Sequence, residues 1–263
     1  MRKRKGRANG QEAIAAHYRQ KIEDGQLRPG DALPSMRHVC EQFEASITTV
    51  NRAFRILKDE GLTSAKPGVG TVVRDRSRAR VPFSAYEAAL RPDGDRGPWE
   101  QATAAQGLDG RMEVRPPVEE PAPEDVAHAF GISPGAPVIR RRRRAMIGED
   151  VVQLQDAWYP LDIARTAGLD APGKITGGVL GAMVGAGLLP SETDHRVTAW
   201  VPTTEQAAEL ALGERTAVLV VERVTRDEAG RVLEVVRVTG AADRLELVYE
   251  RLPLNRPTKR STG

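Results

Sequence analysis

The sequence predicts an α+β protein with two domains, and three features of its 263 residues support this class. The first 80 residues show helical apolar periodicity that ends in a short hairpin pattern. The remainder alternates long strand patterns, joined by turn residues, with short helical segments, as in a domain built on an antiparallel sheet. The chain is also long enough for two domains with separate cores.

Positive charge is concentrated at the N-terminal end of the chain. Residues 1–80 contain 17 Lys and Arg against 9 Asp and Glu, and residues 81–263 contain 22 against 27, although the formal net charge is only +3. The first domain is therefore expected to contact a polyanion such as nucleic acid. The single cysteine fits a reducing compartment. We find no membrane-spanning run and no secretory signal, so a cytoplasmic protein without a membrane partner is expected.

The chain begins with a basic segment, residues 1–10, which is expected to be a disordered tail. An alternative is an arm that contacts phosphates or the minor groove. The first helix is predicted over residues 11–24, because Ile14, Tyr18 and Ile22 share one side and a glycine follows the end.

Two further helices are predicted from serine caps and apolar stripes. Ser35 and Ser46 each precede apolar residues at i, i+3, i+4 and i+7. The turn between the two stripes is so short that they must pack on each other. The second helix is then left with a polar face, made by Thr48, Asn51, Arg52 and Arg55. Such a face suits a DNA major groove, where amide, hydroxyl and guanidinium groups match base edges and phosphates.

A hairpin follows these helices, with strands at residues 62–66 and 71–74 around a Pro-Gly-Val-Gly tip. Three helices followed by a hairpin is the order of a winged helix-turn-helix, which we assign to residues 11–75. A linker is expected at 76–98, where Arg, Pro, Gly and Asp dominate.

The second domain is expected over residues 99–250, followed by a flexible tail at 251–263. A strand pair at 138–147 and 151–158 turns at Gly148, and a capping box of Thr203 and Gln206 starts a helix. Further strands are predicted at 113–117, 193–201, 217–225, 233–238 and 245–250, and further helices at 123–130, 161–167 and 175–186.

Ordered motifs in both domains resemble known families. Leu33-Pro34-Ser35-x-Arg37, Ser46-x-x-Thr49-Val50, Leu57-x-x-x-Gly61-Leu62 and Gly68-x-Gly70-Thr71-x-Val73 resemble the DNA-binding domain of GntR-type bacterial regulators. Phe130-Gly131-Ile132-x-Pro134-Gly135-x-Pro137-Val138, Tyr159-Pro160 and Glu234 ahead of Asp243-Arg244 resemble the UTRA effector-binding domain of the HutC branch, which is similar to the chorismate lyase fold. The resemblance implies a homodimer that binds a palindromic operator and responds to a small-molecule effector.

The expected DNA contacts come from the helix-turn-helix and the wing. Ile47 and Asn51 stand where the family often has arginines, so they predict contacts to a thymine methyl and to adenine instead. Wing glycines would allow close approach to the DNA backbone, unless the tip is only an ordinary hairpin turn. The full expected set is Arg37, Ser46, Ile47, Thr48, Thr49, Asn51, Arg52, Arg55, Lys66, Gly68 and Gly70.

A run of five arginines, Arg140–Arg144, marks the expected effector site. On a strand, alternate members face opposite sides, so one set can be solvated while the other presents guanidinium groups to an anion. The resemblance implies Arg142 and Arg144 as the anion-binding pair, with Gln155 in place of an acidic residue on the partner strand and Glu234 as a second contact. The implied effector is small and anionic.

The predicted function is a ligand-responsive transcriptional regulator, with a repressor expected, that binds an inverted-repeat operator in double-stranded DNA as a homodimer and is released by its effector. The alternative is a small-molecule enzyme, lyase-like, fused to a DNA-binding domain. We expect no enzyme activity, because no nucleophile–base pair is recognisable in the second domain. No cofactor or metal is expected, since the four histidines and the cysteine show no metal-ligand spacing.

Overall fold

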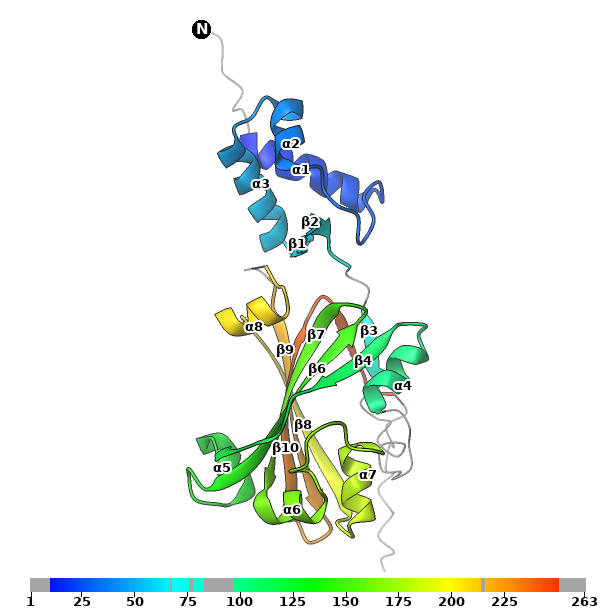
Figure 1. The fold of residues 1–263 in the computed structure, drawn as a ribbon, viewed down its shortest axis with the longest axis vertical. Helices are drawn as coiled ribbons and strands as arrows, with labels where there is room; N and C mark the ends of the chain where they lie inside the picture. Colours follow the sequence, from blue (N-terminus) through cyan, green and yellow to red (C-terminus); the bar gives the residue numbers. More distant parts are fainter. Residues whose placement is uncertain (1–9, 67, 76–77, 83–96, 214–215, 251–263) are drawn as a thin grey trace, which may run out of the picture.

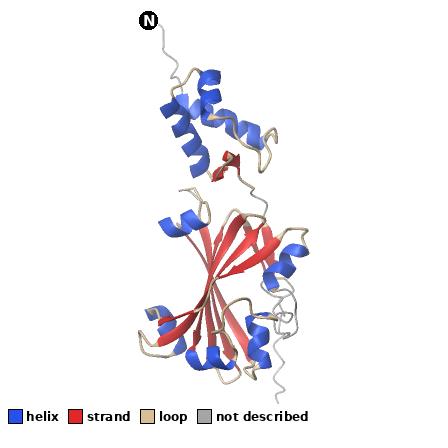
Figure 2. Cartoon of the chain, in the orientation of Figure 1, coloured by secondary structure: helices blue, strands red, loops and turns tan. Residues whose placement is uncertain are grey.

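The structure, a computed structural model, describes residues 10–66, 68–75, 78–82, 97–213 and 216–250. A helical domain and a larger domain around a twisted sheet follow one another along the long axis (Figures 1 and 2). The predicted α+β class is confirmed. The tails expected at both ends fall on residues 1–9 and 251–263, which lie outside the described residues, whereas Gly10 already begins the first helix.

The first domain consists of three helices and a hairpin, as predicted. Its elements are α1 (Gly10–Glu23), α2 (Met36–Phe43), α3 (Ile47–Asp59), β1 (Thr63–Lys66) and β2 (Gly70–Val73). The Ser46 hydroxyl caps α3 by accepting the amide proton of Thr49 over 3.2 Å, and Ser35 caps α2 in the same way. The three helices and the hairpin share one core, which includes Ile14, Tyr18, Val39, Val50, Phe54, Leu57, Leu62 and Val73.

The expected linker contains a strand. β3 (Ala79–Pro82) pairs in parallel with β11 (Leu245–Val248) near the end of the chain, and Ala79 is buried against Trp99 and Leu245. Residues 79–82 are therefore built into the second domain. A four-residue strand whose partner is so distant in sequence leaves no periodic pattern to detect. Residues 83–96 lie outside the described part of the chain.

A seven-stranded antiparallel sheet forms the second domain. Its strand order is β4-β6-β7-β10-β9-β8, and β5 pairs with β6 beside β4. The strands are β4 (Gly110–Val114), β5 (Val118–Pro121), β6 (Pro137–Ile147), β7 (Asp150–Pro160), β8 (Pro190–Trp200), β9 (Val218–Asp227) and β10 (Val232–Ala241). The β6–β7 pair predicted from the Gly148 turn is confirmed.

Helices cover both faces of this sheet (Figure 1). They are α4 (Pro98–Ala104), α5 (Glu124–Phe130), α6 (Leu161–Thr166), α7 (Gly178–Gly185) and α8 (Thr204–Glu209). One face, here the α6–α7 face, packs Ile139, Tyr159 and Val236 against α6 and α7. The other, the α5–α8 face, packs Trp158 and Val235 against α5, and Val218 against the residues that end α8.

Most predicted elements are present, with shifted ends. The strand predicted at 113–117 is two short strands, β4 and β5, on either side of a Pro-Pro pair that cannot donate to a ladder. The helix predicted at 175–186 begins only at Gly178, after Gly177 in the left-handed conformation. The capping box of Thr203 and Gln206 is present at the start of α8. None of the described helices combines the length and apolar composition that a membrane span requires.

Candidate functional site

The face of α3 opposite the core is open to solvent. Val50, Ala53 and Leu57 are fully buried, so the rest of the helix surface points outward. The exposed side chains of α3 include Ile47, Thr48, Asn51, Arg52 and Arg55, while Thr49 is half-buried. The predicted polar face is therefore presented by a capped, well-packed helix.

The start of α3 combines hydroxyl groups with free helix amides. The Ser46 and Thr49 hydroxyls lie 2.9 Å apart, so they can act together on a phosphate oxygen. Arg37, at the start of α2, is exposed and pairs through Nε with Glu41 over 3.1 Å. The Arg37 side chain is 91% exposed, so its guanidinium group is accessible to a phosphate.

The wing places exposed groups at its tip. Lys66 ends β1, and Gly68 and Gly70 have φ angles of 75° and 110°, which glycine adopts without steric cost. No atom lies within 4 Å of where a Cβ would stand on either glycine. The tip therefore has open space on its outer side.

The five arginines lie on β6 and alternate between the two faces of the sheet. Directly opposed residues share a face, and the register pairs Arg143 with Gln155 and Arg142 with Asp156. Glu234 is buried in β10. The next residue, Val235, lies opposite Trp158 on the α5–α8 face, so the Glu234 side chain points to the other face. Gln155 and Glu234 therefore share the α6–α7 face with Arg141 and Arg143. The structure does not bring them together with Arg142 and Arg144.

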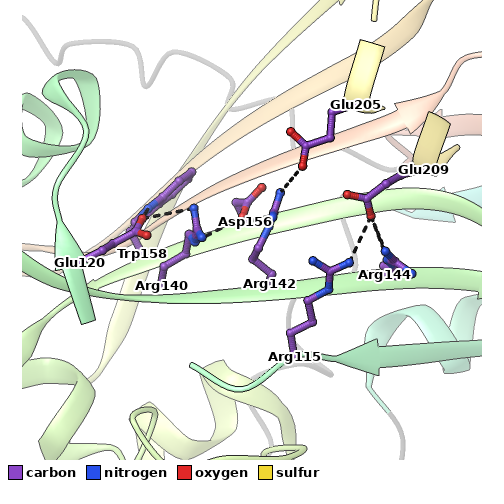
Figure 3. Close-up of polar contacts among 9 residues, drawn as sticks. All are labelled: Arg115, Glu120, Arg140, Arg142, Arg144, Asp156, Trp158, Glu205 and Glu209. Atoms are coloured by element: carbon purple, nitrogen blue, oxygen red, sulfur yellow. Dashed lines mark hydrogen bonds and ion pairs between the residues drawn. The ribbon is translucent and has the colours of Figure 1, made fainter. Parts of the chain in front are cut away.

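On the α5–α8 face, the arginines are paired with carboxylates (Figure 3). Arg144 contacts Glu209 of α8 at 2.7 Å, and Arg115 approaches the same carboxylate at 3.6 Å. Arg142 lies 3.0 Å from Asp156. Arg140 lies 3.4 Å from Glu120, so the charge of this row is largely balanced within the protein.

On the α6–α7 face, two arginines lie close together without such balance. Arg141 is buried and donates to the carbonyl oxygens of Leu169 and Ala171, at 2.6 and 2.8 Å, and of Gly173. Arg143 donates to the Tyr159 hydroxyl over 3.0 Å. Within the described ranges, neither guanidinium has a carboxylate at ion-pair distance. Burial, together with the charge of Arg143, lowers the pKa of Arg141.

The polar row continues across the same face to β9 and β8. Glu234 accepts from Arg223 at 2.6 Å and from the Thr225 hydroxyl at 3.1 Å. His195 of β8 lies directly opposite Arg223 of β9. Burial, and then the charge of Arg223, lowers the pKa of His195 to about 4, so the imidazole is neutral near pH 7. Burial also raises the pKa of Tyr159 to about 12.

Sequence reasoning did not select Arg141, Arg143, Tyr159, Arg223 or His195. Strand alternation placed Arg141 and Arg143 together, but only the register of β6 on β7 identifies the face that also holds Gln155. Among the residues the structure describes, no three His, Cys, Asp or Glu side chains gather in a way that suits a metal ion.

Comparisons with known proteins agree on the two domains. Residues 11–73 match the family described as bacterial regulatory proteins of the gntR family, and residues 105–246 match the UTRA domain. An HTH-type transcriptional regulator of Streptomyces coelicolor is 30% identical over 90% of both chains. The HTH-type transcriptional repressor PhnF of Mycolicibacterium smegmatis is 26% identical over 83% of this chain and 84% of its own. The crystal structure of PhnF from Mycobacterium smegmatis shares the fold, with a TM-score of 0.56, 24% identity and coverage of 90% and 97%.

Proposed function

Because the chain belongs to the GntR family of bacterial regulatory proteins and carries a UTRA domain, we propose that it represses transcription as a homodimer on an inverted-repeat operator. It is a transcriptional regulator with a DNA-binding domain and an effector-binding domain. The observation that carries the proposal is the exposed polar face of α3. The opposite face of the helix is buried in the core of the first domain, and this fixes the orientation of the polar face. The repressor role is supported by the similarity to PhnF, which is named a repressor. Such a protein acts at the chromosome, hence in the cytoplasm.

In this proposal, the start of α3 reads bases and its surroundings bind phosphates. Ile47 and Asn51 contact base edges in the major groove, and Thr48, Arg52 and Arg55 extend the same surface. Phosphates are bound by Arg37, Ser46 and Thr49 at the helix starts. Lys66, Gly68 and Gly70 of the wing approach the backbone.

We assign the effector to the α6–α7 face, and this assignment differs from the expectation based on Arg142 and Arg144. Arg143 has a hydroxyl partner but no carboxylate within the described residues, and Arg141 adds a second charge nearby. Guanidinium groups without a carboxylate at ion-pair distance favour a carboxylate or phosphate of a ligand as the partner. Gln155 and Glu234 then contact polar groups of the same effector. Arg142 and Arg144 are already paired, so they take a structural role.

We assign the dimer contact to the outer edge of β8. This eleven-residue strand ends the sheet, and long open edges are normally protected in soluble proteins. Large apolar side chains are exposed on it and at its end, including Val197, Trp200 and Val201. An antiparallel edge strand can pair with its own copy across a two-fold axis, which is the symmetry that an inverted repeat requires.

Selection of bound sequences from random DNA tests this function. We expect an enriched inverted repeat whose half-sites lie about one helical turn, roughly 34 Å, apart. Repeating the selection with a metabolite pool should release the DNA if the pool contains the effector. Failure to enrich any sequence would count against DNA recognition itself, whereas enrichment of single half-sites would count against the dimer.

A further inference from the structure

The two domains touch through backbone atoms at Gly213. A methyl group on this residue would lie 1.9 Å from the carbonyl oxygen of Lys58 and 2.8 Å from the Cα of Asp59. These atoms belong to the last turn of α3. Figure 1 shows that end of α3 beside the segment that joins α8 to β9. The helix that is proposed to read DNA, α3, therefore rests directly on the second domain. At this distance, only glycine fits at position 213.

A buried charge pair lies beside this contact. Arg74, which follows β2, donates to Asp243 of the second domain over 2.8 Å, and their side chains are only 5% and 11% exposed. A methyl group on Gly61 would meet the Thr216 hydroxyl at 2.9 Å. The contact thus joins the end of α3 and the end of the wing to the same part of the second domain.

This arrangement restricts the space around the DNA-reading face. Asn51, Arg55 and Lys58 line a groove of about 480 Å³ together with Leu212 and Gly213 of the second domain. A helix that reads DNA sits in a major groove about 12 Å wide, with a phosphate backbone on each side. Arg55 and Leu212 line the same small groove, so we infer that a duplex does not fit between them in this arrangement. The docked position therefore obstructs α3 from Asn51 to Lys58.

The segment that makes the contact is held firmly to the sheet. Glu209, at the end of α8, accepts from Arg144 at 2.7 Å, and Leu210 and Leu212 are buried in the sheet domain. Between the leucines, Ala211 has a φ of 49°, a left-handed conformation that alanine adopts only when its surroundings enforce it. Glu209 and the two leucines thus fix the position of Gly213.

We propose that the contact of Gly213 with α3 is autoinhibitory, and that Glu209 is the residue that positions it. The contact keeps Asn51 and Arg55 away from duplex DNA, and its release frees the DNA-binding domain. The inference rests on the proposed function, because it concerns how the regulator reaches its operator.

The test compares full-length wild type, Gly213→Ala and Glu209→Gln on one duplex that the wild type selects from random DNA. We expect Gly213→Ala to bind it more tightly by roughly fivefold or more, a typical coupling between sites. Amide exchange in residues 58–62 and 241–244 should accelerate, because the domains separate. Glu209→Gln should shift both measurements in the same direction by less, since the buried leucines remain.

Two control variants accompany these changes. Glu205→Gln removes a carboxylate from the same helix, but Glu205 is 72% exposed and lies 3.9 Å from Arg142, so it should behave as wild type. Gly97→Ala places a methyl group only against the end of the Glu100 side chain, far from the contact. Equal or weaker DNA binding by Gly213→Ala and Glu209→Gln overturns the inference while leaving the proposed function intact. A wild type that selects no sequence would refute both.

Discussion

Arg143 and Arg144 are neighbours in the chain, yet their guanidinium groups lie on opposite faces of the seven-stranded sheet. Arg143 donates to the Tyr159 hydroxyl on the α6–α7 face. Arg144 pairs with Glu209 on the α5–α8 face. One strand thus carries both the proposed effector contact and the contact that fixes α8, and substitutions at adjacent positions should have different consequences.

Arg143→Gln should weaken anion binding, whereas Arg142→Gln should not. Loss of a charged hydrogen bond costs about 1.5–3 kcal/mol, or roughly 10- to 150-fold in affinity. Calorimetric titration with inorganic phosphate at constant ionic strength measures the phosphate affinity of each variant. Stronger loss in Arg142→Gln would return the effector to the α5–α8 face.

Arg52→Ala should reduce affinity for the operator. A guanidinium contact to a base or phosphate contributes about 1–3 kcal/mol, so we expect a loss of roughly 5- to 150-fold. Fluorescence anisotropy at several salt concentrations gives the affinity and the salt slope. Arg165→Ala, on the surface of the second domain, serves as the control, and equal losses in both variants would argue against a specific role for α3.

Val197→Lys should convert the dimer to a monomer. Lysine in the middle of an edge strand places like charges against each other across the two-fold axis. Sedimentation velocity measures the association state. Val118→Lys is the matched control, because Val118 is exposed to a similar degree, 48% against 43%, on β5 at the other side of the sheet. A dimeric Val197→Lys variant would exclude β8 as the interface.

The protein should lose stability as the pH falls from about 6.5 towards 4, in part because of His195. Its folded pKa of about 4 lies below the ordinary histidine value of about 6.5, so the unfolded chain binds the extra proton first. This contribution is complete above pH 6.5 and amounts to roughly 1–3 kcal/mol for a partly exposed ring. Urea unfolding between pH 4 and 7 should show a shallower pH dependence in His195→Asn. Identical profiles for the two proteins would indicate that His195 is protonated alike in both states.

The first domain was predicted from sequence because its signals are local. Serine caps, apolar stripes and a glycine-rich tip each act within a few residues, and Ser46 and the α3 stripe were located correctly. β3 was missed because its partner among the described residues, β11, is near the other end of the chain. Local patterns contain no information about such a pairing.

Which arginines share a face with Gln155 could not be read from the sequence, for a different reason. A β-bulge between Ala145 and Met146 shifts the register of β6 on β7 by one residue. If the strands continued from the Ile147–Asp150 pair without a bulge, Arg142 would lie opposite Gln155. With the bulge, Arg143 takes that place. A shift by one residue moves every side chain beyond it to the other face, and the turn sequence alone does not reveal it.

Five identical residues in succession cannot specify their own alignment. If β6 slipped by one position, each arginine would be replaced by another arginine, and the run itself would offer no resistance. The alignment must therefore be set by its ends, where Val138 and Ile139 enter cores on opposite faces and Ala145 and Met146 frame the bulge. Substitutions at these apolar positions would rearrange the charges of the strand without altering any charged residue.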